Sequence, residues 1–166
     1  MEIGRRSIME WGLLAGAAGL MSAGGSRTGG AAAPPAGAQA PGFYRFQVGE
    51  IEVTLLNDGA AVRPLQEGFV RNASLDEVQA ALEEAFQPRD TITIPFTATL
   101  VNTGQRLVLI DSGNGEMGAS GTGRLLANLQ VAGYAPEQID LVIVSHFHGD
   151  HINGIRRKDG SATFTN

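Results

Sequence analysis

Polar and apolar residues alternate along residues 43–48 and again along residues 51–57, with Gly49 between the two runs. Alternation with a period of two is typical of half-buried strands, and a glycine between two such runs favours a tight turn. We therefore expect an antiparallel pair of strands, the second of which ends at the turn-forming sequence Asn57-Asp58-Gly59.

Two stretches have the periodicity of helices. Ser74-Leu75-Asp76-Glu77 is a capping box, and apolar residues follow it at helical spacing until Pro88 stops the helix. A second helix is predicted over residues 124–132, with Gly133 as its C-terminal cap, and one further helical turn over residues 136–138.

Three further runs predict strands. Residues 91–102 are rich in Thr, Ile, Phe and Val, and residues 106–110 are almost continuously apolar. Residues 141–144 are entirely apolar, so we expect a short strand that is buried on both faces. Strands that are followed by a strand–helix–strand unit predict an α/β layered fold with a mixed sheet.

Residues 1–38 are rich in Gly and Ala and have the layout of an export signal. Arg5-Arg6-Ser7-Ile8-Met9 resembles a twin-arginine signal, and the apolar run over residues 11–23 is too short for a permanent membrane span. We expect cleavage after Ala38, a periplasmic or secreted protein that meets the membrane only during export, and a folded domain over residues 39–166. The alternative is a disordered tail on a cytoplasmic protein.

Composition excludes several kinds of chemistry. The chain has no cysteine, which excludes a disulfide scaffold, a thiolate nucleophile and a Cys-ligated metal. A net charge of -5 and a pI near 5.1 argue against a nucleic-acid partner, which would call for a basic surface. We therefore expect a small-molecule substrate.

All three histidines of the chain lie within residues 146–151, directly after the predicted strand over residues 141–144. Ligands of α/β proteins bind at the carboxyl ends of the strands. Clustered His and Asp residues at such a place indicate a metal-ligand set. A surface loop without a role, or a structural site for a single ion, is the alternative.

The spacing of these residues suits two metal ions. His146 and His148 project to the same side of an extended segment, and a tight bend at Gly149 would turn Asp150 and His151 towards a neighbouring position. Nitrogen and oxygen ligands without sulfur suit zinc best, with iron, manganese and cobalt as alternatives. A water that bridges two such ions would be acidified to a hydroxide nucleophile, which favours hydrolysis.

The pattern His146-x-His148-x-Asp150-His151 resembles the signature of the metallo-β-lactamase-fold hydrolases. The resemblance implies an αβ/βα sandwich with two divalent metal ions. It implies that His146 and His148 bind one ion, that Asp150 and His151 bind the other, and that Asp150 also orients the nucleophilic water.

Asp111-Ser112-Gly113 resembles an earlier Asp-x-Gly of the same family, which follows a strand. In the family this aspartate supports the metal site from behind the ligating histidines, as carboxylates commonly do. A turn cap is the alternative role for Asp111.

Four further stretches resemble the exported methyl-parathion-hydrolase branch of the family, namely residues 41–46, 100–104, 123–129 and 132–140. This resemblance implies a secreted dinuclear hydrolase that acts on an organophosphate triester, a lactone or another ester. His151 stands where some true β-lactamases carry Arg, which favours the lactonase, glyoxalase and phosphotriesterase side of the family.

The family's metal site also contains a later His, a bridging Asp and a final His, whereas no histidine follows His151. Residues 161–164 have the pattern of the beginning of another strand. We therefore expect an N-terminal fragment, the first half of the sandwich, whose remaining metal ligands lie beyond residue 166. Alone it would be inactive, and its uncovered apolar face would favour association, for example as a homodimer.

Two other functions are compatible with the sequence. One is a truncated, non-catalytic chain that binds metal weakly. The other is an iron-dependent redox member of the same fold, such as a sulfur dioxygenase.

Two weaker candidates have ordinary structural explanations. Phe69, Phe86, Phe96 and Phe147 could line a substrate pocket, but aromatic residues at strand and helix spacing are more often core residues. Arg156-Arg157-Lys158 could attract an anionic substrate, but we favour a solvated turn before Asp159-Gly160.

Overall fold

The computed structural model describes residues 36–37 and 40–166. The predicted export signal and its cleavage site after Ala38 lie outside these residues, so both stay predictions. No helix among the described residues is long and apolar enough to cross a membrane.

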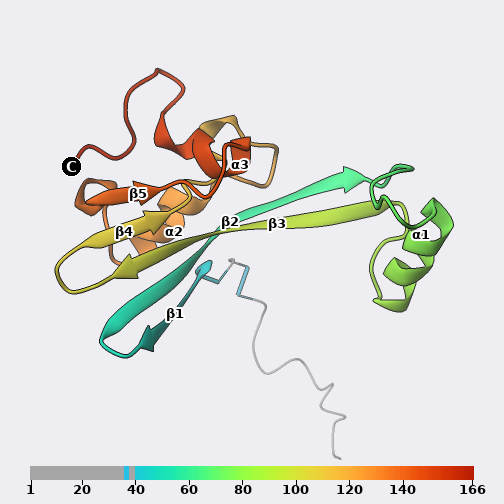
Figure 1. Ribbon diagram of the computed structural model, residues 1–166, viewed down its shortest axis with the longest axis horizontal. Coiled ribbons are helices and arrows are strands. Elements are labelled where there is room, and N and C mark those ends of the chain that lie inside the picture. The colour runs from blue at the N-terminus through green and yellow to red at the C-terminus, as the bar shows by residue number, and fades with distance from the viewer. Residues whose placement is uncertain (1–35, 38–39) are drawn as a thin grey trace, which may run out of the picture. The chain divides into compact units, whose positions relative to one another are not determined.

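Five strands form one sheet in the order of the sequence (Figure 1). They are β1 (Phe43–Val48), β2 (Ile51–Pro64), β3 (Thr91–Asn102), β4 (Leu107–Ile110) and β5 (Leu141–Ile143). The pairings of β1 with β2, β2 with β3 and β3 with β4 are antiparallel, whereas β5 pairs with β4 in parallel. The α/β fold with a mixed sheet is thus confirmed.

Strand β2 does not end at Asn57-Asp58-Gly59, as the sequence led us to expect. It continues to Pro64 along β3, with a register shift between Asn57 and Gly59 that leaves Asp58 as an extra residue. This is a bulge, in which a glycine with positive φ relieves the backbone; Gly59 has a φ of 100°. The turn-like sequence therefore bends a long strand instead of ending it.

Helices connect the strands. They are α1 (Leu75–Glu84), α2 (Leu125–Val131) and α3 (Gly149–Ile152), together with three short 3-10 helices, η1 (Gly115–Met117), η2 (Pro136–Gln138) and η3 (Asn153–Ile155). The predicted capping box of α1 is confirmed, because the Ser74 hydroxyl accepts from the Glu77 backbone and the Glu77 carboxylate accepts from the Ser74 backbone. Helix α1 lies at the far end of the β2–β3 ribbon (Figure 1).

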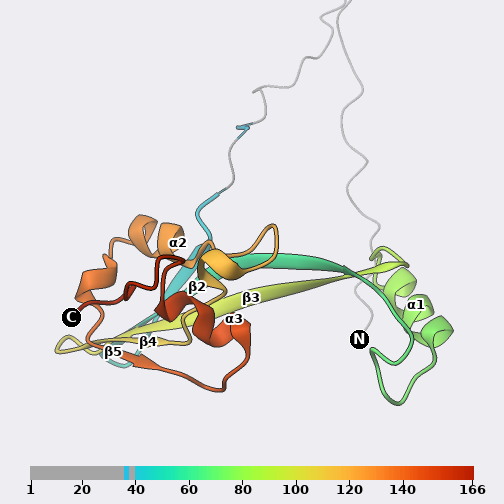
Figure 2. The same cartoon turned by 90° about the horizontal axis from the view of Figure 1, so that it is seen from above.

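Helix α2 packs on one face of the sheet and closes the core (Figure 2). Leu125 and Leu129 of α2 are buried against sheet residues that include Leu100 and Leu109. Gly133 follows the last turn of α2, and its φ of 96° lets the backbone N–H of Tyr134 donate back to the Leu129 carbonyl. The second predicted helix is therefore confirmed together with its glycine cap.

The opposite face of the sheet is apolar and only partly covered by the described residues. Register pairs Phe46 with Val53, Val53 with Val101, and Val108 with Leu141, so these side chains share the face that points away from α2. Large apolar side chains on this face are exposed: Tyr44, Phe46, Val48, Ile51, Leu141 and Ile143.

The prediction that residues 141–144 are buried on both faces is wrong for the described part of the chain. Strand β5 stands at the end of the strand order, and Leu141 and Ile143 are each 46% exposed. Only its inward side chain, Val142, packs against the core.

A polar network ties β1 and β2 to the segment after α2. Arg45 donates to the Thr54 hydroxyl and to the Ala132 carbonyl, and it forms an ion pair with Glu52. The Tyr134 hydroxyl donates to Glu52 at 2.6 Å. Burial and this hydrogen bond raise the pKa of Tyr134, so the phenol stays protonated and the network intact at neutral pH.

The segment after η3 is a turn with little strand structure. Ala162 forms an isolated bridge with Arg156, so the expected strand over residues 161–164 is present only as this one pairing. Arg156, Arg157 and Lys158 are exposed, and the Gly160 backbone donates to the Arg157 carbonyl. The solvated turn is confirmed.

Candidate metal centre

The histidine segment and Asp111 lie at the same edge of the sheet because β4 and β5 are parallel neighbours. Asp111 directly follows β4, and Ser145 and His146 follow β5 after one further residue. The Asp111 backbone N–H donates to the carbonyl of Ile143, which extends the pairing of the two strands to their ends. Segments that are 34 residues apart in the sequence are thereby brought into contact.

The rings of His146 and His148 converge on one point. Nε2 of His146 lies 3.1 Å from Nδ1 of His148, with the two ring centroids 4.7 Å apart and nearly perpendicular. Both side chains are exposed. The structure thus places the two histidines on the same side of the extended segment, as the spacing predicted.

Asp150 and His151 lie in the single turn of α3. His148 is the N-cap of this turn and has an extended backbone, and Gly149 begins the helix instead of forming a left-handed bend. The turn brings Oδ2 of Asp150 to 3.1 Å from Nε2 of His151. It also places the His151 ring 3.8 Å from the His146 ring, so the two pairs adjoin.

Asp111 contacts His151 on the opposite side of its ring. Oδ2 of Asp111 lies 2.7 Å from Nδ1 of His151. Both ring nitrogens face a carboxylate, but the contact of Nδ1 with Asp111 is shorter than the 3.1 Å contact of Nε2 with Asp150. This favours the proton on Nδ1 and directs the lone pair of Nε2 towards Asp150. Asp111 also has a positive φ of 64°, a strained conformation that supports a role beyond capping a turn.

The Asp111 carboxylate is stabilised in its charged form. Partial burial raises its pKa, but hydrogen bonds from the Ser145 backbone, the His151 ring and the Ser145 hydroxyl outweigh burial. The pKa of Asp111 therefore lies below its ordinary value. A carboxylate that is charged at neutral pH is the form that can orient a ligating histidine.

Ser145 is a contact that the sequence analysis missed. Its hydroxyl donates to Asp111 at 2.9 Å and lies 3.1 Å from Nδ1 of His146. Because its one proton goes to Asp111, the hydroxyl can accept from a protonated Nδ1, which leaves Nε2 of His146 free. The only signal in the sequence was its position directly before His146.

The spacing of the donor atoms is compatible with two metal ions, each held by one pair of side chains. Two ligand atoms that bind one tetrahedral zinc ion at about 2.0–2.1 Å lie about 3.3 Å apart. The two pairs, His146 with His148 and Asp150 with His151, are both spaced at 3.1 Å. Within residues 36–37 and 40–166 no group of three or more His, Asp or Glu side chains is arranged around one point.

A close backbone contact joins the loop after β4 to the histidine helix. The backbone N–H and the hydroxyl of Ser112 both donate to the carbonyl of His151, at 2.8 and 2.9 Å. The Gly154 backbone donates to the carbonyl of Gly113 at 3.1 Å. The approach leaves no room for a side chain at Gly154, where a Cβ would lie 1.8 Å from the Ser112 carbonyl oxygen.

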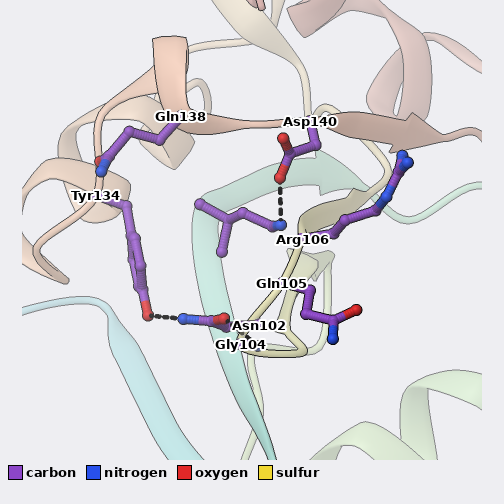
Figure 3. Close-up of a pocket in the computed structure, with 8 residues that line it drawn as sticks. Asn102, Gly104, Gln105, Arg106, Tyr134, Gln138 and Asp140 are labelled. Atoms are coloured by element: carbon purple, nitrogen blue, oxygen red, sulfur yellow. Dashed lines mark hydrogen bonds between the residues drawn. The ribbon is translucent and has the colours of Figure 1, made fainter.

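A separate hollow of about 190 Å³ lies at the other end of β4, where Leu107 begins the strand that leads to Asp111 (Figure 3). In this hollow Asp140 accepts from the Leu107 backbone and Asn102 donates to Tyr134. Strand β4 separates this hollow from the histidines, which lie beyond its other end.

The predicted aromatic candidates form neither a core nor a pocket among the described residues. Phe86 is 96% exposed, Phe147 is 86% exposed and Phe69 is 49% exposed. Phe96 is half-buried on β3. The expectation that these residues are core residues is therefore wrong for Phe69, Phe86 and Phe147.

Comparison with known proteins agrees with this geometry. Residues 95–157, which include Asp111 and the histidine segment, match the family model of the metallo-beta-lactamase superfamily. The chain is 32% identical to AidC, described as a dizinc quorum-quenching lactonase in complex with a homoserine product, with a TM-score of 0.72 over 75% of this chain and 42% of that one.

It is also 35% identical to AbOPH, described as a hydrolase in the beta lactamase superfamily, with a TM-score of 0.69 over 78% of this chain and 44% of that one. The fold is that of the metallo-beta-lactamase superfamily. A probable metal-dependent hydrolase from Staphylococcus aureus shares this metallo-beta-lactamase fold at 24% identity, with a TM-score of 0.57 over 72% of this chain and 46% of that one.

The chain spans less than half the length of each of these three proteins and matches the N-terminal part of the metallo-beta-lactamase fold.

Proposed function

We propose that this chain contributes the first half of the active site of a metal-dependent hydrolase that acts on an ester, lactone or phosphotriester. The observation that carries the proposal is the convergence of two donor pairs, each spaced at 3.1 Å, beside a charged Asp111. The likeness of the chain to two hydrolases of the same fold supports it.

In this proposal each ligand has a defined role. Nε2 of His146 and Nδ1 of His148 hold one divalent ion, and Asp150 and Nε2 of His151 hold the second. Two such ions would supply an acidified water as the nucleophile and a Lewis acid for the bond that breaks. The second oxygen of Asp150 would orient that water by accepting a hydrogen bond from it, and Asp111 keeps the proton of His151 on Nδ1.

We rank lactones and other carboxylic esters before phosphotriesters as substrates. The support is the similarity of the chain, at 32% identity, to AidC, a lactonase whose structure holds a homoserine product. Zinc is the ion that we propose first, because the donors are nitrogen and oxygen atoms and AidC is described as dizinc.

The test is an assay of the protein as its source cells make it, after zinc is added to the metal-free protein. We expect two zinc ions per chain, and hydrolysis of an N-acyl homoserine lactone that is faster than that of a phosphotriester such as paraoxon. A chelator should abolish hydrolysis, and added zinc should restore it.

A chain that binds zinc at neither pair, or that hydrolyses none of these substrates when two zinc ions are bound, would contradict the proposal. Iron in the protein from its source cells, together with oxygen uptake on a persulfide, would favour the redox alternative instead. Heat-treated protein with the same zinc content is the control for hydrolysis by free metal.

We also propose that residues 1–38 export the protein. The support is the order of Arg5-Arg6, an apolar run over residues 11–23 and a small-residue cleavage site at Ala38. Mass spectrometry of the protein from the periplasm or medium of its source cells should find Gln39 at the N-terminus. A cytoplasmic protein that retains Met1 or Glu2 would contradict export.

A further inference from the structure

Asp58 is a fully buried carboxylate that has no place in the metal-ligand set. It is the extra residue in the bulge of β2, and it is 0% exposed. One oxygen, Oδ1, accepts from the backbone of Leu125 at 2.9 Å, at the first turn of α2. The other oxygen, Oδ2, accepts from the Asn114 backbone at 2.7 Å and from its side-chain amide at 2.9 Å.

The backbone around Asp58 packs closely against its carboxylate. Gly113 has a φ of 74°, and a Cβ at this position would lie 2.8 Å from the carboxyl carbon of Asp58. The Asp58 carbonyl also accepts from the backbone of Arg124. Asp58 therefore joins β2, the start of α2 and the loop over residues 111–114.

The same loop is in contact with His151 at two separate points. At its first residue, Asp111 accepts from Nδ1 of the His151 ring at 2.7 Å. At its second residue, Ser112 donates twice to the His151 carbonyl. The loop thus controls both the ring orientation and the backbone position of a proposed ligand, and Asp58 holds the far end of the loop.

We propose that Asp58 is a positioning residue for the Asp150–His151 donor pair, acting through the loop over residues 111–114. The proposal rests on the proposed function, since it concerns the second of the two metal sites. The charged hydrogen bonds of Asp58 keep Asn114 in place, and Asn114 fixes the loop that orients His151. The His146–His148 pair reaches this loop indirectly, through the Ser145 hydroxyl, which donates to Asp111 and lies 3.1 Å from Nδ1 of His146, so its own metal affinity should depend less on Asp58.

The test is Asp58→Asn in the full chain. The amide keeps the shape of the carboxylate, but it replaces one acceptor oxygen by an NH2 group that faces backbone donors. Partners behind metal ligands typically change affinity by about 10–100-fold. We expect one of the two cobalt-binding steps to lose about tenfold or more in affinity, while the other step changes by less than threefold.

The probe is Co²⁺ alone, added to the metal-free protein and followed by its visible absorption bands, which report on the ligands without any substrate. The matched control is Thr54→Val, which removes another buried hydrogen bond, that to Arg45, on the same strand. Thermal unfolding of both variants without metal measures how much each one destabilises the fold.

The outcomes separate the two proposals. If the unaltered chain binds no Co²⁺, the proposed function fails. If it binds two ions and Asp58→Asn binds both with the same affinities and absorption bands, only the positioning role fails. That role also fails if Asp58→Asn and Thr54→Val weaken both binding steps alike, because the effect would then follow from stability alone.

Discussion

Replacement of His148 by alanine is expected to lower kcat/KM for ester or lactone hydrolysis about 1,000-fold and to remove one of two bound zinc ions. The physical reason is the 3.1 Å contact between Nδ1 of His148 and Nε2 of His146, because one imidazole alone leaves half of this donor pair. A metal ion supplies several kcal/mol of transition-state stabilisation, and each 1.36 kcal/mol corresponds to a factor of ten in rate. The measurements are kcat/KM and the zinc content of the dialysed protein.

Phe147→Leu is the matched control, since Phe147 lies between the two histidines and is 86% exposed. Its side chain points away from those of its neighbours in an extended segment, so this variant should keep both zinc ions. If His148→Ala also keeps both ions and its activity, the pairing of His146 with His148 is not a metal site. Cobalt content that parallels the zinc content would show that the loss does not depend on the ion used.

Local patterns in the sequence were sufficient for most of the elements. The capping box at Ser74, the glycine after α2 and the alternation of β1 each act within a few residues, and each one is found where it was predicted. Such signals are reliable because their physical cause is local, either a hydrogen bond within one turn or the period of one strand.

Non-local features were predicted less well. The sequence Asn57-Asp58-Gly59 has the composition of a hairpin turn, but pairing with β3 continues past it and turns it into a bulge. The residues that satisfy the Asp58 carboxylate, Asn114 and Leu125, are 56 and 67 positions away. No local sequence pattern could predict these contacts.

The prediction that β5 is buried on both faces was wrong for a related reason. An apolar run indicates that a strand will be covered, but it does not say by which part of the chain. Leu141 and Ile143 lie on the sheet face opposite α2, where the described residues leave large apolar side chains exposed. The apolar pattern therefore predicted burial that the described residues do not provide.

The candidate metal centre was easier to predict than the loop that supports it. The four proposed ligands lie within six residues of one another, so short-range geometry determines how they pair. The role of Asp111 was predicted from the resemblance of Asp111-Ser112-Gly113 to the family's Asp-x-Gly at the end of a strand, whereas Ser145 and Asp58 gave no comparable signal. Hydrogen-bonding residues such as these become visible only when the strands bring distant segments together.

Replacement of Gly154 by alanine is expected to destabilise the metal-free protein by about 3 kcal/mol or more, above the usual range for an overpacked position. Gly154 has no positive φ, so alanine would suit its backbone. The cost arises because the new Cβ would lie 1.8 Å from the Ser112 carbonyl oxygen and 2.8 Å from the carbonyl carbon. Neither atom can turn aside as a flexible side chain can, so the loop over residues 111–114 must separate from η3.

Gly160→Ala is the control that separates this contact from the ordinary cost of losing a glycine. Gly160 has a φ of 84° and open space around it, so alanine there should cost only about 1–2 kcal/mol for the left-handed backbone. The measurement is the free energy of unfolding of each variant in urea. A chelator is present so that bound metal stabilises neither variant. Equal losses in the two variants would contradict the close contact at Gly154. A larger loss at Gly154, with weaker binding of one metal ion, would mean that the contact supports both the fold and the position of His151.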